Sequence, residues 1–127
     1  MSTQQVVGTK NEAVLMRWND IESEQLTPLV HRQYLSTPPV TLARFQLKKG
    51  AFVPTHQHVN EQVSYVVSGA LKFVFPDKEL TVRAGEVLCI PSELPHSAEA
   101  VEDCYAIDIF TPARQDWAAK TDSYFMK

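Results

Sequence analysis

The chain has 127 residues, a length that suits one ordinary domain and is too short for two of typical size. Hydrophobic residues make up 44% and charged residues 21%, which is typical of a globular domain rather than a disordered or collagen-like chain. The net charge of -3 offers no basic stripe, so we expect no nucleic-acid partner. No apolar run approaches the roughly 20 residues that cross a bilayer, so we expect no membrane partner.

The N-terminal segment is polar and lacks the basic start and apolar run of a secretory signal. We therefore expect a cytoplasmic protein whose residues 1–12 are loose. Cys89 and Cys104 lie in apolar strand-like runs, which predicts buried free thiols rather than a disulfide. Because sheet edges often pair between copies, we also expect a homodimer, with Val14–Trp18 exchanged between subunits.

From Leu29 onward, short runs rich in β-branched and aromatic residues alternate with turn signals, as in an antiparallel sandwich or barrel. The expected strands are Leu29–Leu35, Val40–Leu47, Gln62–Val67, Leu71–Phe75, Glu79–Val82, Glu86–Ile90, His96–Val101 and Tyr105–Phe110. About eight strands indicate an all-β fold, a single jelly-roll β-barrel whose core spans about residues 28–112. Helix is scarce: we expect at most one turn at Asp20–Gln25 and a short helix at Arg114–Thr121 within the C-terminal tail 113–127.

Three of the four histidines fall into one pattern. His56 and His58 are one residue apart, so on an extended strand their side chains leave from the same face. Gln62 keeps that face if the strand continues without a bulge, whereas Glu61 points to the opposite face. His96 comes from a distant strand and must be brought back by the fold. Because imidazole suits several transition metals, the pattern predicts a metal site with these three histidines and Gln62 as ligands.

The plainer interpretation of such histidines is that they satisfy hydrogen bonds inside a barrel. That interpretation suits a single residue such as His31, which lies outside the pattern. Three histidines at ligand spacing favour the metal instead.

An acidic residue, Asp108, interrupts the last apolar run, where an unpaired buried carboxylate costs several kcal/mol. Asp108 and Phe110 share a face, and if that face is the lumen, the carboxylate approaches the metal with an aromatic wall beside it. Arg114 follows on the rim, where a guanidinium could clamp a substrate carboxylate. The alternative is a structural ion pair of Asp108 with Arg44, Arg83 or Arg114.

The spacing around the histidines follows a longer pattern. It reads Gly50, five residues, His56, one, His58, three, Gln62, six, Gly69, and later Gly85, five, Pro91, four, His96. This pattern resembles the two sequence motifs of the cupin superfamily, although Glu93 and Ala100 replace the usual glycine and asparagine of the second motif. The resemblance implies a single cupin domain over residues 1–127 that binds a divalent transition metal: nickel, zinc, iron or manganese.

Gln62 stands where most cupins have a glutamate ligand. A neutral amide in place of a carboxylate leaves the charge of a bound dication uncompensated, which makes a strong Lewis acid.

Four segments carry a narrower resemblance: His56–Val63, Tyr65–Gly69, Pro91–Ser92 with Pro95–His96, and Asp108–Arg114. They look like the KdgF family of pectin-degradation cupins. The resemblance implies ring opening of 4,5-unsaturated monouronates, the products of pectate or alginate lyases, to linear ketouronates. It also implies that Asp108 moves the proton, that Arg114 holds the uronate carboxylate and that Phe110 packs on the sugar ring.

Two other functions stay open from the sequence. One is another small-molecule metal cupin, a dioxygenase, isomerase or lyase; Gln62 counts against an iron oxygenase with two histidines and a carboxylate. The other is a non-enzymatic cupin that binds a small acid, for which a carboxylate at Asp108 has no use.

Overall fold

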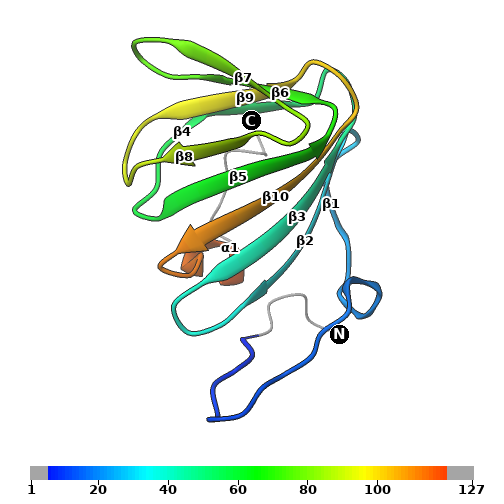
Figure 1. Cartoon of the computed structure of the whole chain (residues 1–127), viewed down its shortest axis with the longest axis vertical. Coiled ribbons are helices and arrows are strands. Elements are labelled where there is room, and N and C mark those ends of the chain that lie inside the picture. Colours follow the sequence, from blue (N-terminus) through cyan, green and yellow to red (C-terminus); the bar gives the residue numbers. More distant parts are fainter. Residues whose placement is uncertain (1–5, 120–127) are drawn as a thin grey trace.

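The computed structural model describes residues 6–119, which form two antiparallel sheets packed face to face (Figure 1). The larger sheet has the strand order β1 (Glu24–Thr27), β2 (Val30–Ser36), β3 (Thr41–Leu47), β10 (Cys104–Thr111), β5 (Glu61–Ser68), β8 (Val87–Ile90). The smaller sheet has the order β4 (Phe52–His56), β9 (His96–Ala100), β6 (Ala70–Val74), β7 (Glu79–Arg83). The expected all-β, single-domain fold is confirmed.

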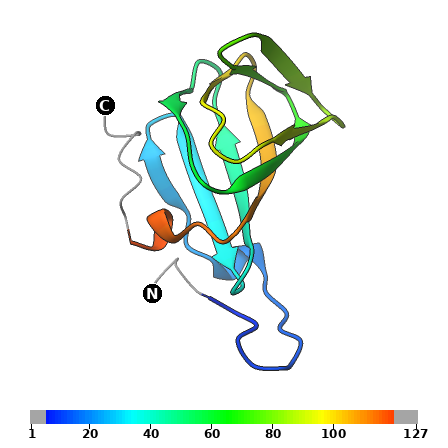
Figure 2. The same cartoon turned by 90° about the vertical axis from the view of Figure 1, so that its left-hand side faces the viewer.

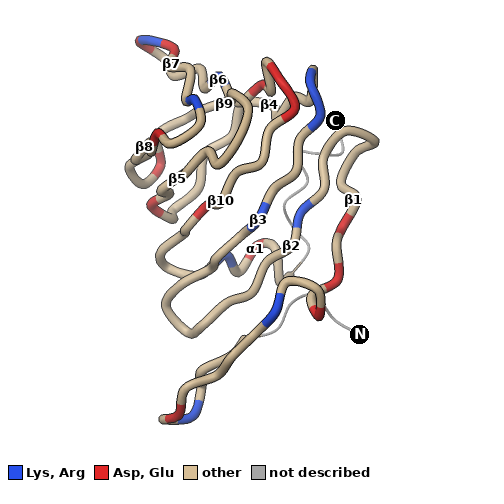
Figure 3. Tube along the Cα trace, turned by 45° about the vertical axis from the view of Figure 1, so that its right-hand side comes forward, with Lys and Arg blue, Asp and Glu red and all other residues tan. Residues whose placement is uncertain are grey.

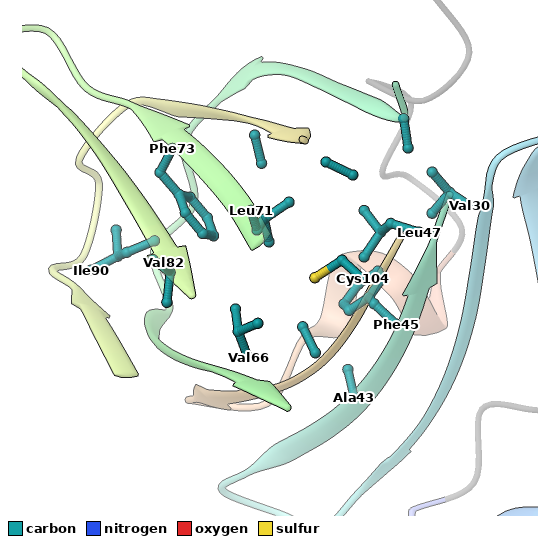
Figure 4. Packing of buried hydrophobic residues seen from close by; sticks show 14 of the residues in the cluster. Val30, Ala43, Phe45, Leu47, Val66, Leu71, Phe73, Val82, Ile90 and Cys104 are labelled. Atoms are coloured by element: carbon teal, nitrogen blue, oxygen red, sulfur yellow. The ribbon is translucent and has the colours of Figure 1, made fainter. Parts of the chain in front are cut away.

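The strands follow from alternation of side chains between core and solvent. Along β10, for example, Ala106, Asp108 and Phe110 are buried while the residues between them are more exposed. Inward side chains of both sheets meet in one hydrophobic cluster, in which Phe45 and Leu71 face each other from opposite sheets (Figure 4). Each such side chain contributes about 1.5–3 kcal/mol when it is removed from water.

Two strands, β1 and β4, were not expected from the sequence. The helical turn expected at Asp20–Gln25 is wrong: a short 3-10 turn, η1, spans Trp18–Asp20, and β1 begins at Glu24. Pairing with β2 explains the extended backbone of β1, since Glu24 lies opposite Arg32 in register and their side chains form an ion pair at 3.0 Å. Four residues are too few for their own pattern to reveal a strand.

A short helix, α1 (Gln115–Ala118), follows β10 where the sequence predicts Arg114–Thr121; residues beyond 119 lie outside the described part. Its Trp117 is buried and packs edge-on against Tyr34 of β2 and Phe45 of β3. Figure 2 shows α1, in orange-red, beside the blue strands β1 and β2. The six-stranded sheet is wider than its partner, so α1 covers inner surface that the four-stranded sheet does not reach.

The cysteines are both free, as expected, but only Cys104 is buried. Cys89 is exposed because it lies on the edge strand β8, whose alternation turns it to solvent. Within residues 6–119, acidic and basic positions are interspersed along the trace (Figure 3). No helix in this part of the chain is long and apolar enough to span a membrane.

The homodimer stays a prediction. In the Val14–Trp18 segment, Val14 and Leu15 are 48% and 81% exposed. If this segment packs on a second copy, light scattering after size-exclusion chromatography should give twice the chain mass, and Leu15→Asp should shift the equilibrium towards monomer. A wild-type monomer at micromolar concentration would contradict the expectation.

Candidate metal centre

The predicted ligands come together from both sheets. His56 ends β4 and His96 begins β9, and the two residues lie opposite each other in register. His58 lies in the loop after β4, and Gln62 is the second residue of β5. One ring nitrogen from each of the three histidines can be chosen so that the three atoms lie within 4.8 Å of one another.

The strand-parity argument for this grouping is wrong in its detail. His56, His58 and Gln62 do not share one strand, because the chain leaves the smaller sheet after His56 and enters the larger sheet at Glu61. Gln62 nevertheless points inward and Glu61 outward, because β5 has its own alternation, with Gln62 and Ser64 both buried. Gln62 rather than Glu61 is therefore the residue beside the histidines.

Each imidazole is oriented by a bond to a backbone carbonyl. The Nδ1 atoms of His56, His58 and His96 lie 2.8, 2.9 and 2.8 Å from the carbonyl oxygens of residues 54, 60 and 94. A carbonyl only accepts hydrogen bonds, so Nδ1 carries the proton in all three rings and Nε2 bears the lone pair. Metal-binding histidines are commonly held in this way.

Burial keeps these rings neutral. Desolvation lowers the pKa of His56 to about 4, with a smaller opposing effect from its bond to the carbonyl of Pro54. Desolvation also lowers the pKa values of His58 and His96. At neutral pH all three imidazoles are in the form that binds a metal.

Two acceptor atoms face each other at the centre of the cluster. Gln62 donates its amide hydrogens to Ser64 Oγ at 2.9 Å and Asp108 Oδ2 at 3.4 Å, which turns its Oε1 towards His58 Nε2 at 3.1 Å. Lone pairs at that separation repel unless a cation lies between them, and two ligands about 2.1 Å from one ion are about 3 Å apart. The buried Nε2 of His96 has no hydrogen-bond partner within residues 6–119. The donor set therefore fits a divalent transition metal, in agreement with the predicted ligands.

Asp108 reaches the cluster from the larger sheet. Its strand places it opposite Ser64, and it shares the inner face with Phe110, as predicted. Oδ2 accepts from Gln62, and Oδ1 has no partner among the described residues. Burial raises the pKa of Asp108 to about 7, against smaller opposing effects of the Ser64 hydrogen bond and the Arg114 charge.

Arg114 is buried, not on the rim as the sequence suggested, because its backbone N–H donates to Thr41 Oγ1 inside the barrel end. Its guanidinium donates to both carboxylate oxygens of Asp116, at 2.8 and 2.7 Å, and lies over the rings of Phe110 and Trp117. Its positive charge also lowers the pKa values of the three histidines, so it lies near them.

The structural ion pair considered for Asp108 is not formed. The ion pairs found within residues 6–119 join other side chains, and Arg114 is paired with Asp116. Asp108 is thus a buried acid without an ionic partner among the described residues, next to the cluster of predicted metal ligands.

The cluster lies between two spaces of different size. An inner cavity of about 50 Å³ is lined by His56, Gln62, His96, Asp108, Phe110, Arg114, Trp117 and apolar core residues. A surface groove of about 350 Å³ is lined by His58, Asn60, Gln115, Asp116 and neighbouring residues. The short segment Arg114–Trp117 lines both, so it lies between the cavity and the groove.

Sequence reasoning missed Ser64, Asn60 and Trp117 in this region. Ser64 could have been found, because it shares the inward parity of Gln62 on β5. Trp117 could not, because a single tryptophan in a polar tail carries no signal of where that tail packs.

Residues 43–110 match the family described as the cupin domain, which is more than half of the chain. The chain belongs to the cupin family. The cluster of predicted metal ligands lies inside this cupin region, whereas Arg114 and Trp117 follow it.

Solved structures support the assignment. KdgF from Halomonas sp. is 27% identical, with a TM-score of 0.72, over 78% of this chain and 94% of that one. An RmlC-like cupin from Shewanella frigidimarina is also 27% identical, with a TM-score of 0.76, over 84% and 96% of the two chains. The polyketide cyclase RemF from Streptomyces resistomycificus, at 20% identity and a TM-score of 0.66 over 79% and 80%, shares the fold alone. No curated protein matches the chain in sequence.

Removal of one imidazole should abolish tight metal binding. We expect His96→Ala to weaken Ni²⁺ or Zn²⁺ binding by more than about 100-fold, since the loss of supporting groups around a metal already costs about 10- to 100-fold. Isothermal titration of metal-free protein measures it. His31→Ala, at the histidine outside the cluster, is the matched control, and equal losses in both variants would contradict the assignment.

Ionisation of Asp108 should destabilise the fold. Its folded pKa of about 7 lies above the unfolded value of 3.8, so the folded state binds the extra proton and wild-type stability falls as pH rises between them. Asp108→Asn removes this dependence, so its free energy of unfolding relative to wild type should rise by about 4 kcal/mol from pH 4 to pH 8. Urea denaturation of metal-free proteins measures the difference, in which the histidine contributions cancel. A difference that stays flat with pH would refute the prediction.

Proposed function

We propose that this cupin opens the ring of 4,5-unsaturated monouronates to give linear ketouronates. The observation that carries the proposal is Asp108, a buried carboxyl that has no ionic partner within residues 6–119 and lies beside the predicted metal ligands. A cupin that only binds an anion gains nothing from this carboxyl. The likeness to KdgF from Halomonas sp. agrees with the proposal.

The reaction is an isomerisation, so a single group can both take and return its proton. The C1 hydroxyl gives its proton to Asp108 as the bond from C1 to the ring oxygen breaks, which leaves an aldehyde at C1 and an enolate at C5. Return of that proton to C4 converts the enolate to the C5 ketone, so no proton is gained or lost overall. Asp108, whose pKa is about 7, is present in both its acid and its base forms at neutral pH, which suits both transfers.

The other residues take supporting roles in this proposal. His56, His58, Gln62 and His96 would hold a divalent metal. When bound, that metal supplies Lewis-acid polarisation of the sugar oxygens. Arg114 would hold the uronate carboxylate and Phe110 would pack on the sugar ring, because the guanidinium and the ring lie together in the cavity wall.

The size of the cavity sets a condition on this function. About 50 Å³ holds only a few water molecules at about 10–15 Å³ each, whereas ligand pockets usually have about 300 Å³ or more. Outward movement of α1 with Trp117 would join the cavity to the groove and make room for a monosaccharide. The small cavity favours, as a second candidate, binding of a smaller acid without turnover.

Turnover separates the two candidates. Metal-loaded protein should accelerate the loss of ultraviolet absorbance from the conjugated double bond of an unsaturated monouronate. Asp108→Asn should lower kcat by about 100- to 10,000-fold with metal content unchanged, because it removes the group that transfers the proton.

Asp77→Asn, in the exposed turn between β6 and β7, is the matched control and should keep wild-type turnover. If no divalent metal supports acceleration over the spontaneous reaction, the ring-opening function is refuted and the small-acid-binding cupin is favoured.

A further inference from the structure

Asn60 forms hydrogen bonds both to the cluster of predicted metal ligands and to the segment that carries Arg114. It lies in the loop between His58 and β5 and is only 3% exposed. Its backbone and its side chain bind in opposite directions, one towards the metal-ligand cluster and the other towards the segment that carries Arg114.

The backbone of Asn60 orients a predicted metal ligand. Its carbonyl oxygen lies 2.9 Å from Nδ1 of His58, the bond that turns the Nε2 lone pair of this ring into the cluster. Any residue at position 60 has this carbonyl, so the bond places no demand on the side chain.

The side chain of Asn60 binds the chain beyond β10. Its Nδ2 donates to the carbonyl oxygen of Pro112 and, at 3.3 Å, to that of Ala113. These are the two residues directly before Arg114, and β10 has already ended at Thr111. Only a side chain with a short N–H donor can hold both carbonyls, so this bond does depend on asparagine.

The next anchor is the backbone N–H of Arg114 itself, in the same peptide group as the Ala113 carbonyl. The backbone N–H of Arg114 donates to Thr41 Oγ1 at 2.8 Å, and Thr41 is held in turn by Ser36 at 2.7 Å. The backbone directly before α1 is thus held by Asn60 through its carbonyls and by Thr41 through its N–H, and α1 beyond it is a single short turn.

We propose that Asn60 is a positioning residue that sets the distance between the metal-ligand cluster and Arg114. Ligands recognised by this site carry a carboxylate and a metal-binding oxygen at that one separation, so Asn60 determines the length of the acid that is accepted. The inference rests on the proposed function for the identity of the acid. The hydrogen bonds from the Asn60 side chain to the carbonyls of Pro112 and Ala113, called the clamp below, are a property of the protein alone.

The clamp is tested first without substrate. The chain has two tryptophans, so in a Trp18→Phe background the emission reports Trp117 alone. Asn60→Ala should shift this emission to longer wavelength and increase quenching by acrylamide, since it releases the base of the segment that carries the ring. Asn11→Ala, the same exchange at an exposed position, is the control and should change neither. Unchanged emission in Asn60→Ala overturns the proposal.

Kinetics and metal binding then separate positioning from a general structural role. Asn60→Ala should raise KM for the unsaturated monouronate about tenfold, as expected for about two lost hydrogen bonds, and leave kcat within about twofold. Ni²⁺ affinity should stay within about twofold, because the backbone bond to His58 remains. In an Arg114→Lys background, which lacks the guanidinium fork, the effect of Asn60→Ala on KM should shrink.

Three results would overturn the inference: an unchanged KM, a fall in kcat and metal affinity together with the rise in KM, or full additivity with Arg114→Lys. Absence of turnover in the wild type refutes the proposed reaction instead, and the emission of Trp117 then decides on the clamp by itself.

Discussion

The site depends on three hydrogen bonds that lie outside it. Each imidazole of the cluster is bound at Nδ1 by a backbone carbonyl two residues away along the chain, which leaves the Nε2 lone pair to point inward. A side-chain partner would itself have to be ordered, at a cost in conformational entropy. A backbone carbonyl, by contrast, moves only if the strand end that carries it moves. Because β4 and β9 pair at His56 and His96, the register of the smaller sheet also fixes the distance between two of the rings. The geometry of the candidate metal centre is in this sense a property of the backbone.

A glutamine suits this centre because of its neighbour. The amide presents an oxygen to the histidines and hydrogens to Ser64 and Asp108 at the same time. A glutamate at position 62 could do only the first, since it would set a second carboxylate beside Asp108 with no donor between them. The amide at Gln62 therefore suits the acid at Asp108. A neutral amide would also leave the charge of a bound dication uncompensated. This physically links the predicted ligand Gln62 to Asp108, the group proposed to transfer the proton.

Much of the fold and of the site could be predicted from the sequence, because both depend on local pattern. Alternation located most strands, and ligand spacing identified the three histidines and Gln62. The same reasoning failed where strand pairing, rather than the pattern of residues along one strand, determines the structure. β1 and β4 are too short to show a period, and a break between sheets after His56 cannot be read from residue parity. Cys89 was expected to be buried because its strand is apolar, but an edge strand turns alternate residues to solvent.

The C-terminal segment shows why the rest of the site could not be predicted. Two sheets of unequal width leave the inner face of β2 and β3 uncovered, and the sequence does not state their widths. Trp117 fills that space, with Arg32 and Arg114 stacked on its ring at 4.1 and 4.3 Å. Two residues of the cavity wall, Arg114 and Trp117, thus lie beyond the cupin region, at the start of a single helical turn and within it. Since His56 and His96 come from paired strand ends and Trp117 comes from this turn, the arrangement of the predicted metal ligands and the size of the cavity depend on different parts of the chain.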